Sequence, residues 1–240
     1  MTNYVGPRGI RAAFIEDETP VQRYLETLGN EDFRVIAGYP TVEDFCSARP
    51  EVDVVILDLW IRAAEDLPQP VRGHKALTAL RRMGYRVLIY TSERRRFVLA
   101  RLIRAGASGI VLKTEPDYVL PKAVVAVADG GVVLPMELTG FIELLQREQL
   151  LPSIGAQRLR VLQGRARGES NRSIAARLHV TEKAVENYTT LNNAAFAEFI
   201  RTVDLQGLDP AASSSAAAIA KMLGVGSGDL FDPDAPDLAT

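Results

Sequence analysis

The sequence predicts a doubly wound α/β domain with a parallel sheet, followed by a smaller all-helical domain. Between residues 10 and 131, five apolar runs rich in β-branched residues alternate with amphipathic helical segments. The runs are almost continuously apolar, which indicates strands covered by helices on both faces. Between residues 153 and 200 no segment has the pattern of a strand, and helical periodicity prevails.

The elements of the first domain follow in order along the chain. The predicted strands are RAAFI, FRVIAG, VDVVILDL, RVLIYT and SGIVL. Pro20 suits the first position of the first helix, and the helical segments GHKALTALRRMG and RRFVLARLIRAG both end in glycine, a common C-terminal signal. The joints between these units are short, which favours a doubly wound sheet, except for a longer joint over residues 60–72 that is rich in proline and charge.

Composition limits the classes of function. The 240 residues include 28 Lys and Arg against 30 Asp and Glu, so nucleic acid would have to bind a local basic patch. A single cysteine, Cys46, provides neither an internal disulfide nor a cysteine metal cluster, which favours a reducing environment. The start of the chain lacks a secretory signal, and no apolar stretch reaches the roughly 20 residues needed to span a bilayer. We therefore expect a cytoplasmic protein with no membrane partner.

Polar side chains follow the apolar runs at the ends of four predicted strands. Because the carboxyl ends of parallel strands meet at one edge of a sheet, Asp17, Asp58, Thr91 and Lys113 should converge there. Asp58 suits a nucleophile toward phosphorus that forms an aspartyl phosphate, and Glu16 with Asp17 supplies further oxygen ligands for Mg²⁺. Lys113 would neutralise a phosphate oxygen, and the Thr91 hydroxyl can donate to the phosphoryl group. One such Asp alone is more often a helix cap; the joint occurrence favours a site.

These motifs, IEDE, ILDL, YTS and ASGIVLK, resemble the receiver domain of two-component response regulators over about residues 10–131. The resemblance implies a flavodoxin-like fold with the five parallel strands in the order 2-1-3-4-5. It also implies that a sensor histidine kinase or a small phosphodonor phosphorylates Asp58. Mg²⁺ would be held by Glu16, Asp17, Asp58 and the backbone carbonyl of Trp60.

Two positions depart from the receiver pattern. Receivers usually carry Tyr or Phe three residues before the lysine, where this chain has Ile110, and Pro four residues after the acceptor, where it has Arg62. An alternative in which a ligand or a partner replaces the phosphoryl group therefore stays open. A hydrolase with Asp58 as nucleophile is disfavoured, because ILDLW has no second acid two residues later. We expect a regulator and not an enzyme.

The segment GESNRSIAARLHVTEKAVENYTT has the pattern of two helices joined by a tight turn. Asn171 is expected to cap the first helix and Thr181 the second. Residues 153–205 hold eight Lys and Arg against five Asp and Glu, which gives a local net charge of +3. This sign is opposite to that of the whole chain and suits a modest phosphate-facing patch.

The same segment resembles the helix-turn-helix of the LuxR/NarL/FixJ class, over about 50 residues from Gln157 on. The resemblance implies a recognition helix from Glu182 to about Asn193 in the major groove of promoter DNA, with a homodimer on two half-sites. Asn187 would pair with adenine and Glu186 would accept from cytosine. The residues expected at DNA are Arg172, Thr181, Lys183, Glu186, Asn187 and Thr190.

The predicted recognition helix ends in TTLNNAAFAEF, without the Lys or Arg commonly found there. Fewer cations release fewer counterions and weaken non-specific affinity, which leaves open a protein-interaction module with a degenerate helix-turn-helix. We predict a receiver over 8–131, a connector over 132–152, a LuxR-type domain over 153–205 and a C-terminal extension with an acidic tail over 206–240. The extension is similar to the one in a subgroup of actinobacterial regulators.

Overall fold

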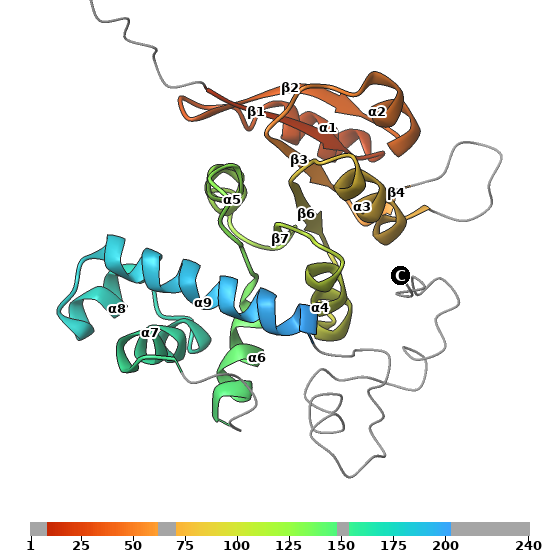
Figure 1. Cartoon of the computed structure of the whole chain (residues 1–240). Coiled ribbons are helices and arrows are strands. Elements are labelled where there is room, and N and C mark those ends of the chain that lie inside the picture. The colour runs from red at the N-terminus through yellow and green to blue at the C-terminus, as the bar shows by residue number, and fades with distance from the viewer. Residues whose placement is uncertain (1–8, 62–70, 148–153, 203–240) are drawn as a thin grey trace, which may run out of the picture. The chain divides into compact units, whose positions relative to one another are not determined.

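A five-stranded parallel sheet forms the centre of the N-terminal part of the chain (Figure 1). In this computed structural model, which describes residues 9–61, 71–147 and 154–202, its strands lie in the order β2-β1-β3-β6-β7. They are β1 Ile10–Ile15, β2 Phe33–Tyr39, β3 Val54–Leu57, β6 Val87–Thr91 and β7 Gly109–Leu112. The short strands β4 (Trp60–Ile61) and β5 (Val71–Arg72) pair separately and antiparallel. Numbered along the chain without them, the main strands have the order 2-1-3-4-5, so the predicted fold class is confirmed.

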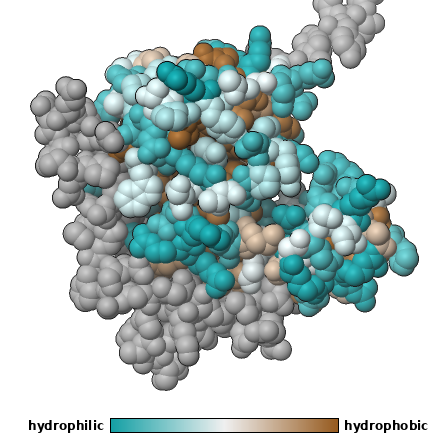
Figure 2. All heavy atoms as spheres, turned by 180° about the vertical axis from the view of Figure 1, so that it is seen from behind, coloured by the Kyte–Doolittle hydropathy of each residue, from teal (hydrophilic) through white to brown (hydrophobic). Residues whose placement is uncertain are grey.

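The apolar runs of the sequence are the interior of this sheet. All residues of β3 and of β7 are buried, as expected for strands covered on both faces. The edge strand β2 alternates instead between more and less exposed residues, and Ile36 is one of its exposed side chains. The face of the molecule seen in Figure 2 is accordingly mostly hydrophilic, with apolar residues in small areas only.

Four helices belong to the same unit as the sheet: α1 Thr19–Glu26, α2 Val42–Ala48, α3 Gly73–Arg82 and α5 Val119–Ala128. Pro20 is the second residue of α1, one position later than predicted, because the helix already begins at Thr19. The two predicted glycine stops, Gly84 and Gly106, have φ values of 90° and 98°. Glycine adopts this left-handed conformation without the steric penalty that a Cβ brings.

The chain divides into two compact units. The first contains the residues up to Ser92 together with Gly106–Gly130, and the second contains Glu93–Ala105 together with the residues from Gly131 on. The helices of the second unit are α4 Arg96–Arg104, α6 Met136–Arg147, α7 Ala156–Ala166, α8 Asn171–Leu178 and α9 Glu182–Thr202. The domain bounds drawn from the sequence stay a prediction, and the extension over 206–240 lies outside the described residues.

Apolar side chains hold the helices of the second unit together. Helix α4 packs against α6 and α9, and the Phe141 ring meets the Phe196 ring edge to face at 5.9 Å between centroids. The helix-turn-helix has a small core of its own, made of Val161, Ile174, Ala175 and Val185. Within the described residues, no helix has the length and apolar character needed to cross a membrane.

Candidate functional site

The strand ends bring the predicted pocket residues of the first unit together. The Asp58 backbone N–H donates to the Ile15 carbonyl at 3.1 Å, which fixes the end of β3 beside the end of β1. On the other side, the Lys113 N–H donates to the carbonyl of Thr91 at 2.7 Å and joins the ends of β6 and β7. The strand ends converge as the sequence pattern predicts, since Asp58 and Lys113 directly follow their strands and Thr91 ends its strand.

Three carboxylates meet at this edge. One oxygen from each of Glu16, Asp17 and Asp58 lies within 4.8 Å of the other two. The Glu16 and Asp58 side chains are 1% and 4% exposed. Carboxylate oxygens at this spacing are a donor set that suits a hard divalent cation.

Lys113 supplies the balancing positive charge. Its Nζ lies 2.9 Å from Glu16 Oε2 and 3.2 Å from Asp58 Oδ2, and its side chain is 17% exposed. A second donor to Asp58 is the backbone N–H of Leu59, 2.7 Å from Oδ1. The ammonium is thus shared between the predicted acceptor and a predicted metal ligand.

Burial governs the protonation of the pocket. It raises the pKa of the Asp58 carboxyl, and Lys113 together with the Leu59 N–H counteracts part of that rise. Burial raises the pKa of Glu16 in the same way. For Lys113, burial acts to lower the pKa, but the hydrogen bond to Glu16 and the charge of Asp58 outweigh it, so that its pKa is raised. The ammonium therefore keeps its charge while it faces both carboxylates.

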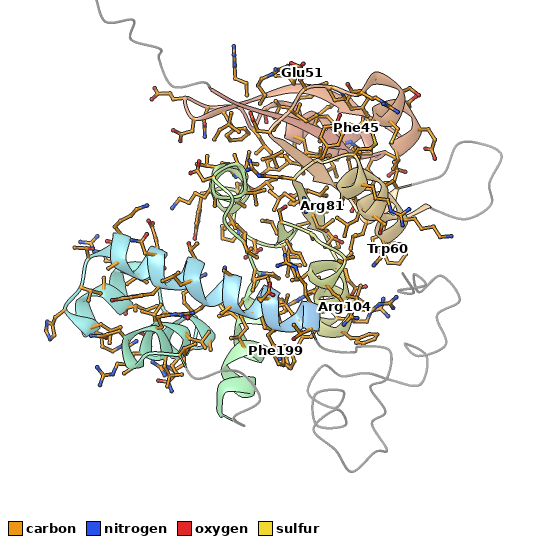
Figure 3. The ribbon with its side chains drawn as sticks, in the orientation of Figure 1. Phe45, Glu51, Trp60, Arg81, Arg104 and Phe199 are labelled. Atoms are coloured by element: carbon orange, nitrogen blue, oxygen red, sulfur yellow. The ribbon has the colours of Figure 1, made fainter. Side chains whose placement is uncertain are left out.

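The chain leaves the pocket along β4, which pairs antiparallel with β5. Trp60, labelled in Figure 3, lies on β4 and is 51% exposed. The backbone returns at Gly73, whose N–H donates to the Leu59 carbonyl at 3.0 Å. The role of the Trp60 carbonyl as a metal ligand stays a prediction, and Arg62 lies outside the described residues.

Sequence reasoning missed one aromatic residue of the pocket, Tyr90. Its ring centroid lies 5.7 Å from Lys113 Nζ and 6.5 Å from the centroid of Tyr24 on α1, with which it stacks. Burial raises the pKa of Tyr90 to about 12, so the phenol is neutral at physiological pH. Its place directly before Thr91 in the run LIYT gave no signal for this contact, since neighbouring strand residues point to opposite faces.

The helix-turn-helix has the predicted local structure with one correction. Ser170, and not Asn171, is the N-cap of α8: its hydroxyl accepts from the Ser173 N–H at 3.2 Å. Asn171 is instead the first residue of the helix. His179 forms the turn with a left-handed φ of 54°. The Thr181 hydroxyl accepts from the Ala184 N–H at 3.1 Å, so its predicted capping role is confirmed.

The side chains predicted to face DNA are exposed. They are Arg172, Thr181, Lys183, Glu186, Asn187 and Thr190. Lys183 Nζ lies 3.5 Å from Glu186 Oε2, an ion pair one turn apart on α9, and the Thr190 hydroxyl donates to the Glu186 carbonyl at 3.1 Å. Ion pairs of this exposed kind are weak and open readily to a competing partner.

The last two residues of the predicted recognition helix, Asn192 and Asn193, are structural. Helix α9 continues past Asn193 to Thr202. Asn192 is buried and bonds Arg158 of α7 twice, through its Oδ1 to the guanidinium at 2.9 Å and through its Nδ2 to the backbone carbonyl at 3.1 Å. Asn193, also buried, donates to the Val132 carbonyl at 2.9 Å. Arg158 therefore fastens α7 to α9.

A parallel α/β sheet with an acidic pocket at its carboxyl edge, followed by a helix-turn-helix, defines a transcriptional response regulator. The probable transcriptional regulatory protein SgaR of Hyphomicrobium methylovorum is 37% identical over 179 residues, which cover 72% of this chain and 80% of SgaR. The nitrate/nitrite response regulator protein homolog of Haemophilus influenzae is 30% identical over 185 residues, 74% of this chain and 85% of that protein. The chain belongs to the NarL/LuxR family of response regulators.

Solved structures agree with the fold. The RcsB response regulator of Salmonella typhimurium, solved in a study of its conformational dynamism for DNA interaction, matches with a TM-score of 0.50 and 16% identity, over 78% of this chain and 92% of RcsB. At this identity the match establishes the fold alone. No family model matches the chain.

Proposed function

We propose that the protein accepts a phosphoryl group on Asp58 and thereby controls transcription through its helix-turn-helix. The observation that carries the proposal is the arrangement of Asp58, a buried carboxylate whose Oδ2 lies 3.2 Å from Lys113 Nζ. Phosphoryl transfer depends mainly on positioning and on neutralising charge, and this arrangement supports both. The phosphoryl source is a sensor histidine kinase or a small phosphodonor.

The chemistry uses the residues of the sheet edge. An Asp58 carboxylate oxygen attacks the phosphorus, an O–P bond forms, and the bond from phosphorus to the leaving group breaks, so that the leaving group keeps the electron pair. Lys113 then pairs with a phosphoryl oxygen in place of a carboxylate. The Thr91 hydroxyl, buried at the end of β6, donates to another phosphoryl oxygen.

The residues at this edge fit Mg²⁺, because three carboxylates offer oxygens within 4.8 Å of one another. Glu16, Asp17, Asp58 and the carbonyl of Trp60 would hold it. A bound Mg²⁺ would supply positive charge against the transferred phosphoryl group.

Intact-protein mass spectrometry after incubation with acetyl phosphate and Mg²⁺ tests the proposal. We expect one phosphoryl addition to the wild type and none to Asp58→Asn, because the amide is not a nucleophile toward phosphorus. Asp32→Asn, which removes an exposed carboxylate, is the matched control and should be phosphorylated normally. Equal addition to Asp58→Asn would place the acceptor elsewhere. No addition to the wild type would favour the alternative in which a ligand or partner replaces the phosphoryl group.

We further propose that the output is a homodimer that binds promoter DNA through α9. The exposed, capped start of α9 supports this assignment. Thr181 and Lys183 lie at the N-terminal end of the helix, the end that contacts DNA when a recognition helix lies in the major groove. In this proposal residues 8–131 are the receiver, 132–152 the connector and 153–205 the DNA-binding domain, and the protein acts in the cytoplasm.

Substitutions on α9 separate base contacts from phosphate contacts. Asn187→Ala should weaken binding to a selected DNA site about 5- to 100-fold and relax specificity at one base pair, because it removes a bidentate contact. Lys183→Ala should weaken binding similarly for all sequences and flatten its salt dependence. Fluorescence anisotropy of the full chain at several salt concentrations measures both, with exposed Lys75→Ala on α3 as control. Unchanged binding in both variants would favour a protein-interaction role for the helix-turn-helix.

A further inference from the structure

Lys113 is held from two directions in the pocket. On one side its Nζ contacts the Glu16 and Asp58 carboxylates at 2.9 and 3.2 Å. In addition, the Tyr90 ring lies 5.7 Å from Nζ, within the range of a cation–π interaction. The ring is partly buried and is backed by Tyr24, whose ring stacks on it with an interplanar angle of 28°.

During phosphoryl transfer the contact of Lys113 with the Tyr90 ring and its contacts with the carboxylates change in different ways. When Lys113 pairs with a phosphoryl oxygen, its contacts to Glu16 and Asp58 have to loosen, because the three donors of one ammonium are shared among more acceptors. The attraction to a ring face is not a hydrogen bond to an acceptor oxygen and does not compete for those donors. The Tyr90 ring therefore provides a contact that Lys113 can keep before and after the transfer.

The geometry points to Tyr90 as a positioning residue: its ring face holds the Lys113 ammonium at the pocket for phosphoryl transfer to Asp58, and Tyr24 holds the ring. This inference rests on the proposed function. The ring is supplied by β6, from the residue before Thr91. Ile110, at the place where other receivers carry an aromatic residue, is fully buried in β7 and offers no ring.

Two substitutions of Tyr90 distinguish positioning from packing. Tyr90→Phe keeps a ring face and should be phosphorylated by acetyl phosphate at close to the wild-type rate. Tyr90→Leu keeps an apolar side chain but has no ring, and the rate should fall about threefold to tenfold, the range expected for a partly desolvated cation–π contact. Tyr118→Leu is the matched control: it removes a ring 5.4 Å from Lys122 Nζ and should leave the rate unchanged.

A second measurement reports the contact directly. In the full chain with ¹³C-labelled lysine, the ε-methylene resonance of Lys113 should show an upfield ring-current shift in the wild type and in Tyr90→Phe, and lose it in Tyr90→Leu. If Tyr90→Leu does not fold, Tyr24→Leu, which removes the backing ring and leaves Tyr90 in place, should reduce the same shift.

The outcomes separate this inference from the proposed function. Equal rates and equal Lys113 resonances in the Phe and Leu variants, beside a normally phosphorylated wild type, would overturn the positioning role alone. A wild type that takes up no phosphoryl group would remove the proposed function and the inference with it. A slow Leu variant with a fast Phe variant supports both.

Discussion

Replacing Lys113 by Met should destabilise the first unit by about 3–5 kcal/mol at pH 7 without Mg²⁺. The Lys113 ammonium faces two carboxylates that are 1% and 4% exposed. Without it, Glu16 and Asp58 lie close together in a buried site with no neutralising side chain between them. Removing one partner of a buried ion pair is costly because the remaining charge has lost its solvent as well as its partner.

The stability lost in Lys113→Met should depend on pH in a defined direction. Burial already raises the pKa of Asp58 and of Glu16, and Lys113 counteracts that rise, so both pKa values rise further in the variant. A carboxyl with a raised pKa in the fold binds a proton there while the unfolded chain has lost it. The stability of the variant is therefore best near pH ~4 and falls as the pH rises through the raised pKa values. The deficit relative to the wild type should be largest above neutral pH and shrink toward pH ~4.

Urea unfolding followed by Trp60 emission measures the stability deficit at each pH, since Trp60 is the single tryptophan and follows Asp58 by two residues. Lys122→Met, which removes an exposed lysine of α5, should be nearly neutral. The double variant Lys113→Met with Glu16→Gln should recover much of the loss, because one of the two facing charges is gone. A deficit that stays constant from about pH 4, where ordinary carboxyl groups titrate, to about pH 8 would show that Lys113 acts by packing alone.

The sheet and its pocket could be predicted because they depend on local signals. The strands β3 and β7 are buried apolar runs, and the residue type at the end of each decides what reaches the edge of the sheet, so Asp58 and Lys113 were found without knowledge of any tertiary contact. The capping role of Thr181 follows from its position before a helical run in the same way.

Contacts between distant elements could not be predicted. Both Ser170 and Asn171 are good capping residues, and only the backbone conformation decides that Ser170 has this role. The contact between Tyr90 and Lys113 depends on how β6 lies beside β7, and the stacking with Tyr24 depends on α1. Asparagine is typical of an exposed helix face, yet Asn192 is buried. Arg158 of α7 supplies the hydrogen bonds that its amide needs there.

Gly73 is a second position where one added atom should have a large effect. It is the first residue of α3 and lies against the backbone that follows the proposed phosphoryl acceptor. A Cβ at Gly73 would lie 2.6 Å from the Leu59 Cα and 3.1 Å from the Asp58 carbonyl oxygen. The nearest atom belongs to the backbone and has no rotamer to change, so either α3 or the segment after Asp58 has to move.

Gly73→Ala should therefore lower the free energy of unfolding by about 1–3 kcal/mol, as overpacking of a buried site does. It should also slow phosphorylation by acetyl phosphate, because Leu59, the residue displaced, donates its N–H to Asp58 Oδ1 at 2.7 Å. Gly29→Ala is the matched control in the same unit: its added Cβ would lie 3.6 Å from the nearest atom, an ordinary van der Waals contact. Urea unfolding and the phosphorylation rate should both change at Gly73 and stay near wild type at Gly29. If stability falls while the rate holds, the acceptor keeps its position independently of Leu59, and the clash is absorbed by α3.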